Sequence, residues 1–219
     1  MKPLIIFGCG DLGQIAQCYF EEDGNRQVAA FTVDAPEAGI STLHGKPLIS
    51  FATLVQDCPP TDFDLFVAIG YSKLNQGRAE VFRRCMDLGY TLASYVSPRA
   101  FVHRTAILGR NVFIFEDNVI QPWVTIGDDV ILWSGNHIGH HSTLKDHCFI
   151  ASHAVISGRV VVGERTFIGV NATITDHVSV GARNLIGAGA LISSDTPDEA
   201  VFRPESLKPS RVPSSRLFR

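Results

Sequence analysis

An aliphatic side chain recurs at every sixth position of the chain from Val96 to Ile192. All seventeen positions of this series are Val, Leu or Ile. Such residues fill roughly a quarter of an average chain, so an unbroken series of this length is not a chance event. Four residues further on, most repeats carry a small or short side chain, as at Ala106, Asn118 and Ser142.

A period of six differs from the 3.6 residues of a helical turn and from the alternation of a long strand. Glycine often follows the aliphatic residue directly, as at Gly109, Gly127 and Gly139, where we expect a turn that needs a residue without a Cβ. The pattern therefore predicts short strands joined by tight turns, stacked as a parallel β-helix with the aliphatic series inside.

The first ninety residues show a different pattern, in which buried strands alternate with amphipathic helices. Strands are predicted at 4–7, 27–35 and 64–70, and helices at 11–22, 50–58 and 75–89. We expect Asp11 and Ser50 to cap the first two helices and Gly89 to end the third. The alternation predicts a small parallel α/β sheet with Rossmann-like βαβ units and a nucleotide-sized crevice at the strand ends.

These patterns divide the chain into an α/β domain at 1–90, a β-helix at 91–193 and a tail rich in Pro and Ser at 194–219. An uncapped solenoid exposes its core and its strand edges. We therefore expect the tail to cap the open end of the β-helix or to wrap around a neighbouring subunit.

The segment "GCGDLG", residues 8–13, lies between the first strand and the first helix. Its GxGxxG spacing suits a dinucleotide, but about ninety residues are half of a dinucleotide domain, and no domain for hydride transfer follows. A mononucleotide or a nucleotide-sugar diphosphate would use the same backbone N–H groups and helix dipole. The alternative is a purely structural tight turn.

Charge and composition exclude several classes of protein. The 219 residues carry a formal net charge of −3, and no run of Lys or Arg exceeds two, so we expect neither nucleic-acid nor membrane binding. No stretch approaches the roughly eighteen apolar residues of a membrane span. Five cysteines without a CxxC pair favour reduced thiols, and we expect a cytoplasmic protein.

Three motifs narrow the possibilities: "VAAFTVDA" with Asp34, "VAIGYSKLNQGR" with Gly70 and Arg78, and "HIGHHSTLKDHCFIASHAVISG". With these motifs the chain resembles the hexapeptide-repeat sugar acetyltransferases, in the branch of the sialic-acid O-acetyltransferases and the bacillosamine-pathway N-acetyltransferases. The resemblance implies a left-handed β-helix of about five coils with three hexapeptides each. It also implies a homotrimer with active sites between subunits.

The resemblance implies acetyl-CoA as the acyl donor and the His of "IGH", His140, as the general base. An amine or hydroxyl that attacks a thioester must lose a proton, and an imidazole with a pKa near 6.5 accepts it near neutral pH. His141 stands where many relatives carry a carboxylate that orients the base. We therefore expect that Asp146 or a backbone carbonyl orients His140, or that no residue has this role. His141 and His137 are the alternative bases.

Four of the eight histidines lie in "SGNHIGHHSTLKDH", residues 134–147, which also raises the possibility of a metal site or of plain surface turns. His141, His147 and His153 are six residues apart, so a three-sided coil directs them to different faces. A zinc site needs three or four converging ligands. We therefore expect no metal.

The acyl donor is expected along small residues that let it approach the backbone, although the same residues would also serve tight turns. By position in the family, the candidates are Phe149, Gly158, Gly169, Val170 and Ala188. Phe149 stands where several relatives carry a His that touches the thioester carbonyl. We expect a backbone N–H to polarise that carbonyl instead.

The candidate residues for a nucleotide sugar are Gly8, Gly10, Asp11, Asp34, Gly70, Lys73 and Trp133. Asp34 would accept a hydrogen bond from a base or ribose hydroxyl, or merely start a loop. Lys73 and Arg78 would meet phosphate, although a solvated helix face is the commoner place for a single Arg. Trp123 and Trp133 would line the sugar cleft or pack between subunits.

The predicted function is an acetyl-CoA-dependent N-acetyltransferase that acts on the amino group of a nucleotide-linked amino-deoxy sugar by direct attack. One alternative is O-acetylation of a sugar hydroxyl, as in the sialic-acid branch. Another is a catalytically silent binding or assembly protein on the same scaffold.

Overall fold

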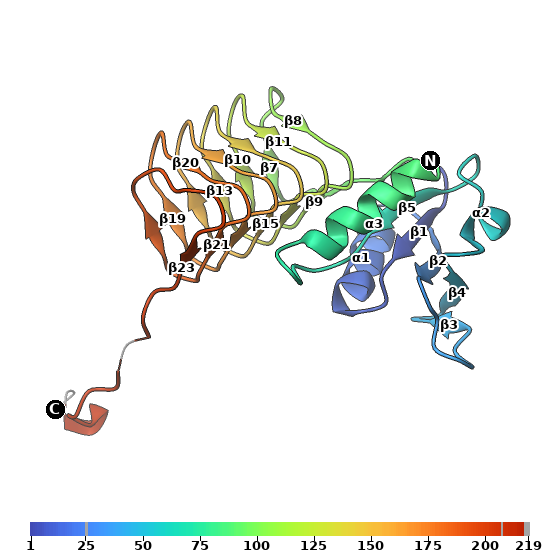
Figure 1. Ribbon diagram of the computed structural model, residues 1–219, viewed down its shortest axis with the longest axis horizontal. Coiled ribbons are helices and arrows are strands. Elements are labelled where there is room, and N and C mark those ends of the chain that lie inside the picture. The colour runs from blue at the N-terminus through green and yellow to red at the C-terminus, as the bar shows by residue number, and fades with distance from the viewer. Residues whose placement is uncertain (25, 207, 217–219) are drawn as a thin grey trace.

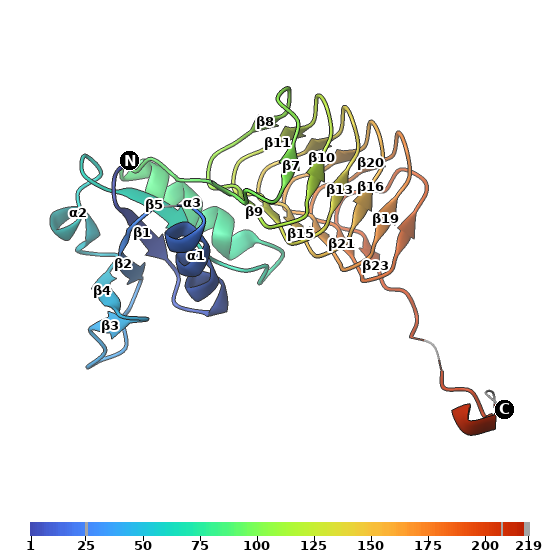
Figure 2. The ribbon, with the colours of Figure 1, turned by 180° about the vertical axis from the view of Figure 1, so that it is seen from behind.

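The computed structural model describes residues 1–24, 26–206 and 208–216 of the chain. An α/β unit at the N-terminus is followed by a left-handed parallel β-helix, and the last residues lead away from its far end (Figure 1). The view from behind shows the same two parts side by side (Figure 2). Within the described residues, none of the helices is long and apolar enough to cross a membrane.

The N-terminal sheet has the strand order β3-β4-β2-β1-β5. Its strands and helices are β1 (Leu4–Phe7), α1 (Asp11–Glu22), β2 (Val28–Val33), β3 (Thr42–Leu43), β4 (Lys46–Ser50), α2 (Leu54–Asp57), β5 (Asp64–Val67) and α3 (Gln76–Asp87). Four strands are parallel, whereas β3 pairs antiparallel with β4. The predicted parallel α/β sheet is therefore confirmed, and a hairpin adds one antiparallel strand, β3, at its edge.

The predicted helix ends need two corrections. Gly10 is the N-cap of α1, and Asp11 is the first helical residue. Ser50 ends β4, and the short helix α2 has Thr53 as its N-cap. The third end is as predicted, since Gly89 follows the C-cap of α3 with a φ of 87°.

The helices cover both faces of this sheet. On one face, Ala16 and Phe20 of α1 pack with Phe31 and Phe66. The same cluster continues into outward-facing residues of the β-helix, including Phe113, Ile131 and Phe149. On the other face, α2 and α3 pack against the alternate residues of β1 and β5. The α/β unit and the β-helix therefore share one aromatic core.

The β-helix consists of two-residue strands in three parallel sheets, ordered β22-β19-β16-β13-β10-β7, β20-β17-β14-β11-β8 and β23-β21-β18-β15-β12-β9-β6. The strands are β6 (Tyr95–Val96), β7 (Phe101–Val102), β8 (Ile107–Leu108), β9 (Phe113–Ile114), β10 (Val119–Ile120), β11 (Thr125–Ile126), β12 (Ile131–Leu132), β13 (His137–Ile138), β14 (Thr143–Leu144), β15 (Phe149–Ile150), β16 (Val155–Ile156), β17 (Val161–Val162), β18 (Phe167–Ile168), β19 (Thr173–Ile174), β20 (Ser179–Val180), β21 (Leu185–Ile186), β22 (Leu191–Ile192) and β23 (Val201–Phe202). We name the sheets by their central members: the β15 face, the β13 face and the β14 face.

Each strand pairs with the strand three repeats later, as Val119 does with His137, which confirms three hexapeptides per coil. The aliphatic series is the second residue of each strand, and from Ile114 to Ile192 it is buried in one core. Val96, which has no coil before it, is 37% exposed. The periodic pattern thus predicted the fold and its inward-facing residues.

The glycines after the aliphatic residues have a different role from the one expected. Gly139 does not have a positive φ, but a Cβ there would lie 2.4 Å from the carbonyl carbon of Ser157 in the next coil. The left-handed position lies two residues later in each repeat, and side chains such as Asp129, His141, His147 and His153 occupy it with φ near 60°. The glycines therefore allow coils to stack closely, while the turns use residues that tolerate left-handed backbone.

The end of the β-helix is closed by residues just after the last repeat. The side chain of Asn184 donates to Thr196 and to the carbonyl of Pro197, and β23 pairs with β21. Beyond β23 the described tail is exposed and runs away from the body of the molecule (Figure 1).

Candidate active site

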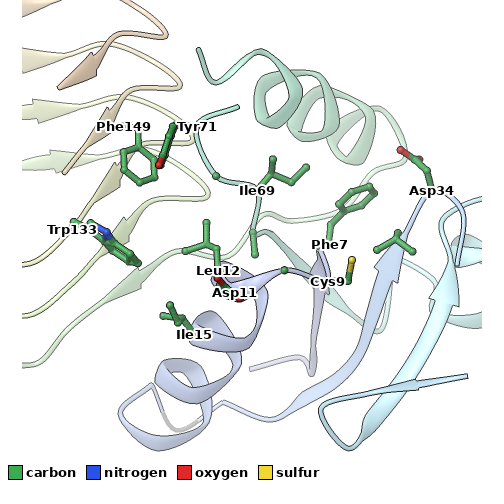
Figure 3. A pocket seen from close by; sticks show the side chains of 15 residues that line it. Phe7, Cys9, Asp11, Leu12, Ile15, Asp34, Ile69, Tyr71, Trp133 and Phe149 are labelled. Atoms are coloured by element: carbon green, nitrogen blue, oxygen red, sulfur yellow. The ribbon is translucent and has the colours of Figure 1, made fainter. Parts of the chain in front are cut away.

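A pocket of about 760 Å³ lies where the Gly-rich loop and the carboxyl ends of β1, β2 and β5 face the β15 face of the β-helix (Figure 3). Its lining includes six of the seven residues predicted to hold a nucleotide sugar, namely Gly8, Gly10, Asp11, Asp34, Gly70 and Trp133. The seventh, Lys73, is exposed on the neighbouring loop and does not line the pocket.

The three glycines of "GCGDLG" serve different purposes. Gly8 has a φ of 127°, and a Cβ there would lie 2.4 Å from the carbonyl oxygen of Ala68. A Cβ on Gly13 would lie equally close to the carbonyl oxygen of Gly8. A Cβ on Gly10 would meet no heavy atom within 4 Å. Packing thus accounts for Gly8 and Gly13, whereas Gly10 leaves open space above the loop.

The N-terminus of α1 faces this open space. Gly10 is its N-cap, and the first N–H groups of a helix have no partner within the helix. Together with the helix dipole, such groups favour an anion. At the far side of the pocket, Arg84 holds the exposed carboxylate of Asp34 in an ion pair, and its hydrogen bonds lower the pKa of Asp34. Asp34 is therefore ionised at neutral pH.

The β-helix contributes an aromatic wall to the pocket. Trp133 and Phe149 project from it, and Tyr71 packs against Phe149 with ring centroids 5.0 Å apart (Figure 3). Phe149 is thus placed with the nucleotide-sugar candidates rather than with the other candidates for the acyl donor. Tyr71, 57% exposed, was missed from the sequence, although its place directly after Gly70 was a signal.

Arg78 contradicts both sequence-based expectations, since it is fully buried and contacts neither solvent nor an open phosphate site. Its guanidinium pairs with Asp129 at 3.0 Å and donates to the carbonyls of Ile69, Gly70 and His147. Arg78 therefore ties the loop that forms one side of the pocket to the β-helix.

That loop has strained backbone. Lys73, Leu74 and Asn75 have consecutive φ values of 49°, 50° and 62°. The side chain of Asn75 donates to the carbonyl of Arg165, and the Arg165 side chain donates to that of Leu74. Left-handed backbone at ordinary residues costs of order 1 kcal/mol each and persists where the surroundings hold it in place.

His140 and His141 occupy the corner between the β13 face and the β14 face, and both are exposed. The His140 Nδ1 and the His141 Nδ1 are 3.0 Å apart. The His140 backbone N–H donates to the Gln121 side chain at 2.9 Å. The ring of Trp123 stacks on His141, with centroids 4.6 Å apart, so Trp123 supports this corner instead of the pocket.

Among the candidates for the acyl donor, Gly158 lies beside His140. A Cβ on Gly158 would lie 2.8 Å from His140 Nε2, so only glycine leaves the imidazole its position. Gly169 and Ala188 stack on one another at a different corner, after the β15 face, where Val170 is 42% exposed. One chain therefore presents these candidates at two separate corners.

Asp146 does not orient His140. It lies at the corner before the β15 face, where its Oδ1 accepts from the Asp128 N–H at 2.8 Å. His137 lies half-buried on strand β13, and His147 contacts the Asp129 carboxylate with its Nδ1 at 2.8 Å.

His141, His147 and His153 lie at three successive corners, as their spacing predicted, and all three occupy the left-handed position. His is one of the side chains enriched in that conformation, which accounts for part of the cluster. Within the described residues, no group of three or more His, Cys, Asp or Glu is placed to hold a metal ion.

Comparisons with known proteins agree with this architecture. The model of the bacterial transferase hexapeptide family (six repeats) matches residues 105–139, 124–158 and 159–194. A sequence comparison with curated proteins finds no significant match. Among solved structures, a variant of perosamine N-acetyltransferase from Caulobacter crescentus, in complex with CoA and GDP-perosamine, is 27% identical with a TM-score of 0.82, over 92% of this chain and 93% of that one.

The acetyltransferase domain of PglB from Neisseria gonorrhoeae, in complex with acetyl coenzyme A, is 26% identical with a TM-score of 0.81, over 91% of this chain and 95% of that one. WeeI from Acinetobacter baumannii, at 16% identity and a TM-score of 0.70, shares the fold over 92% of this chain and 96% of its own. The predicted resemblance and the predicted type of enzyme are thereby confirmed. The chain is an acetyltransferase, and its residues 105–194 match the hexapeptide model and are wound into a left-handed β-helix.

Proposed function

We propose that this enzyme transfers the acetyl group of acetyl-CoA to the amino group of a nucleotide-linked amino-deoxy sugar. The observation that carries the proposal is the pocket that the Gly-rich loop and the aromatic wall of the β-helix form together. The two acetyltransferases compared above hold CoA with GDP-perosamine, or acetyl coenzyme A. They cover 92% and 91% of this chain, so most of its α/β unit is included.

The diphosphate is proposed to lie above Gly10, against the N-terminus of α1, where the open space and the unpaired N–H groups coincide. Asp34 lies across the pocket as an ionised acceptor for a ribose or base N–H or O–H. Lys73, three residues after Gly70, would neutralise negative charge of the diphosphate at the rim of the pocket. The sugar would then extend towards Trp133 and Phe149.

His140 is proposed as the general base. As the sugar nitrogen attacks the thioester carbonyl carbon, the new C–N bond forms, the nitrogen gives its proton to His140 Nε2, and the C–S bond breaks. The CoA thiolate leaves and takes up a proton. Gly158 beside His140, with Gly169, Val170 and Ala188, would accommodate the pantetheine arm.

A homotrimer explains how these parts meet. The pocket lies on the β15 face, whereas His140 lies at the corner between the other two faces, so a neighbouring subunit is proposed to supply the base. Outward-facing apolar residues are exposed in a column on the β13 face: Phe101, Val119, Val155 and Leu191. A column of this kind is suited to packing between subunits.

In this proposal residues 1–90 bind the nucleotide sugar, and residues 91–193 bind acetyl-CoA and carry the base. The tail at 194–219, of which 207 and 217–219 lie outside the described residues, caps the β-helix or reaches a neighbour. We propose that the reaction takes place in the cytoplasm.

The test is release of CoA thiol from acetyl-CoA over a panel of UDP-, dTDP- and GDP-linked 3-amino and 4-amino sugars, with sialic acid included. We expect turnover of one nucleotide amino sugar, and a fall in kcat of about 10²- to 10⁴-fold in His140→Ala. The matched control is His153→Ala, at a corner away from His140. No release with any amino sugar would contradict the proposal, and turnover of sialic acid alone would assign the enzyme to O-acetylation.

A further inference from the structure

The two adjacent imidazoles at the β-helix corner carry an inference that rests on the proposed role of His140. We infer that neutral His141 accepts the Nδ1 proton of His140, and so holds the base in the tautomer whose Nε2 is free to take a proton from the sugar amine. His141 would then be a positioning residue.

The distance between the two rings requires a shared proton. The two Nδ1 atoms are 3.0 Å apart, and their ring planes are at 90°. Two imidazole nitrogens at this separation attract only if one carries the proton and the other offers its lone pair. If His140 donates, its Nε2 has the free lone pair of a base. If His141 donates, His140 Nε2 carries the proton and cannot act as a base.

The surroundings hold both rings in place before substrate binds. The backbone N–H groups of His140 and His141 donate to the Gln121 side chain and to the Pro122 carbonyl. Trp123 stacks on His141 at an interplanar angle of 29°. Gly158 lies against His140 Nε2 and leaves no room for another side chain there. The Nδ1 contact is therefore built into the corner.

The charges around the pair favour His141 as the neutral partner. Partial desolvation of its ring, the positive charge of Arg159 in the next coil, and His140 itself all lower the pKa of His141. Asp176, one coil beyond Gly158, uses its Oδ1 to accept from the Gly158 N–H at 2.7 Å. At neutral pH His141 thus keeps a lone pair for His140.

A neutral acceptor differs from a carboxylate in two ways. It does not favour the protonated form of the base by opposite charge, as a carboxylate would. It can itself be protonated, and His141 would then donate its own Nδ1 proton and force His140 into the wrong tautomer. Protonation of either ring would stop the reaction.

Two substitutions separate these effects, and the chain itself shows that both side-chain types fit. Trp123 and Asp129 occupy the same left-handed corner position as His141, with φ of 60° and 58°. His141→Phe keeps a ring for stacking on Trp123 but removes the acceptor. His141→Asp replaces the neutral acceptor with a carboxylate. His153→Phe, at the equivalent position of another corner, is the matched control.

The measurements are kcat and both KM values from pH 5 to 9, with the full-length enzyme and its best acceptor. We expect His141→Phe to lower kcat at least about tenfold and to leave both KM values unchanged. This loss is smaller than the roughly 10²- to 10⁴-fold rate contribution of the general base itself, because His141 only positions that base. We expect His141→Asp to keep kcat near the parent value and to move the acid limb of the pH profile to higher pH. His153→Phe should match the parent.

Parent kcat in His141→Phe, or an unmoved acid limb in His141→Asp, would overturn the inference. The His140→Ala variant distinguishes this failure from failure of the proposed function. If His140→Ala is inactive while His141→Phe has parent activity, His140 remains assigned as the base, but His141 does not position it. If His140→Ala keeps its activity, the assignment of the base falls as well.

Discussion

The buried guanidinium of Arg78 should be one of the most costly side chains to remove. In Arg78→Met, the side chain keeps its apolar stem but loses its ion pair with Asp129 and its bonds to the carbonyls of Ile69, Gly70 and His147. Both charged groups are 0% exposed, so water cannot replace the lost partner. The hydrogen bonds between Asn75 and Arg165 and between Arg165 and Leu74 would still join the loop to the β-helix.

Breaking a buried ion pair by removing one partner costs about 3–5 kcal/mol, because the other charge stays buried. Here the Asp129 carboxylate keeps hydrogen bonds from Asn111 at 2.7 Å and His147 at 2.8 Å, which places the expected loss towards the lower figure. For a chain of this size, 1 kcal/mol corresponds to about 2–4 °C, so Tm should fall by roughly 6–12 °C.

The assay is thermal and urea unfolding of Arg78→Met at one fixed protein concentration, since subunit assembly makes Tm depend on concentration. Arg83→Met is the matched control, because Arg83 is exposed on the same helix, and it should change stability by less than about 0.5 kcal/mol. Arg78→Met/Asp129→Asn should recover part of the loss, since no unpaired charge is left buried. A loss below about 1 kcal/mol in Arg78→Met, or no recovery in the double variant, would refute the reasoning.

Two further predictions concern stability. Gly139→Ala should lower the free energy of unfolding by about 1–3 kcal/mol, because its Cβ would lie 2.4 Å from the carbonyl carbon of Ser157. Gly77→Ala within α3 should raise the free energy of unfolding by about 0.5–1 kcal/mol, because no atom lies nearer than 4.0 Å to the new Cβ. Equal Tm values for these two variants would contradict the role given to Gly139. Burial raises the pKa of Glu116, but hydrogen bonds from its own N–H and from Tyr19 and Ser134 outweigh this, and the pKa is lowered. The ionised Glu116 carboxylate therefore stabilises the folded state above its unfolded pKa of about 4.3, and this stabilisation is lost as the pH falls through the folded pKa. Between pH 7 and pH 3 the free energy of unfolding, measured with urea, should fall more in the parent than in Glu116→Gln. Parallel declines would show that Glu116 is not a source of acid sensitivity.

The β-helix could be predicted in detail because one rule repeats through it. Every coil buries an aliphatic side chain at the same place, so a local pattern is enough to assign strands, faces and core. The same holds for β1 and α1, whose predicted ranges agree with the structure. The hairpin at β3 and β4 was missed, although His44 and Gly45, with φ of 47° and 77°, form the kind of two-residue turn that His-Gly permits.

The contacts of Arg78 could not be predicted from a local sequence pattern. Its partners Asp129 and His147 lie 51 and 69 residues further along the chain, and no local pattern connects them. One signal was present, since Arg78 shares a helical stripe with the buried Phe82 and Cys85. The placement of Phe149 in the pocket beside the Gly-rich loop likewise depends on how the α/β unit packs against the β-helix, which the repeats alone do not specify.

Because residues 18 positions apart stack directly on one another, the β-helix grows in whole steps. Removal of one complete coil would bring every later residue nearer to the α/β unit by one strand spacing, about 4.8 Å, and would leave it on the same face. Removal of a single hexapeptide would keep the core intact but turn every later side chain onto the next face. The distance along the β-helix axis between the α/β unit and the histidine corner can therefore change only in discrete increments of one coil.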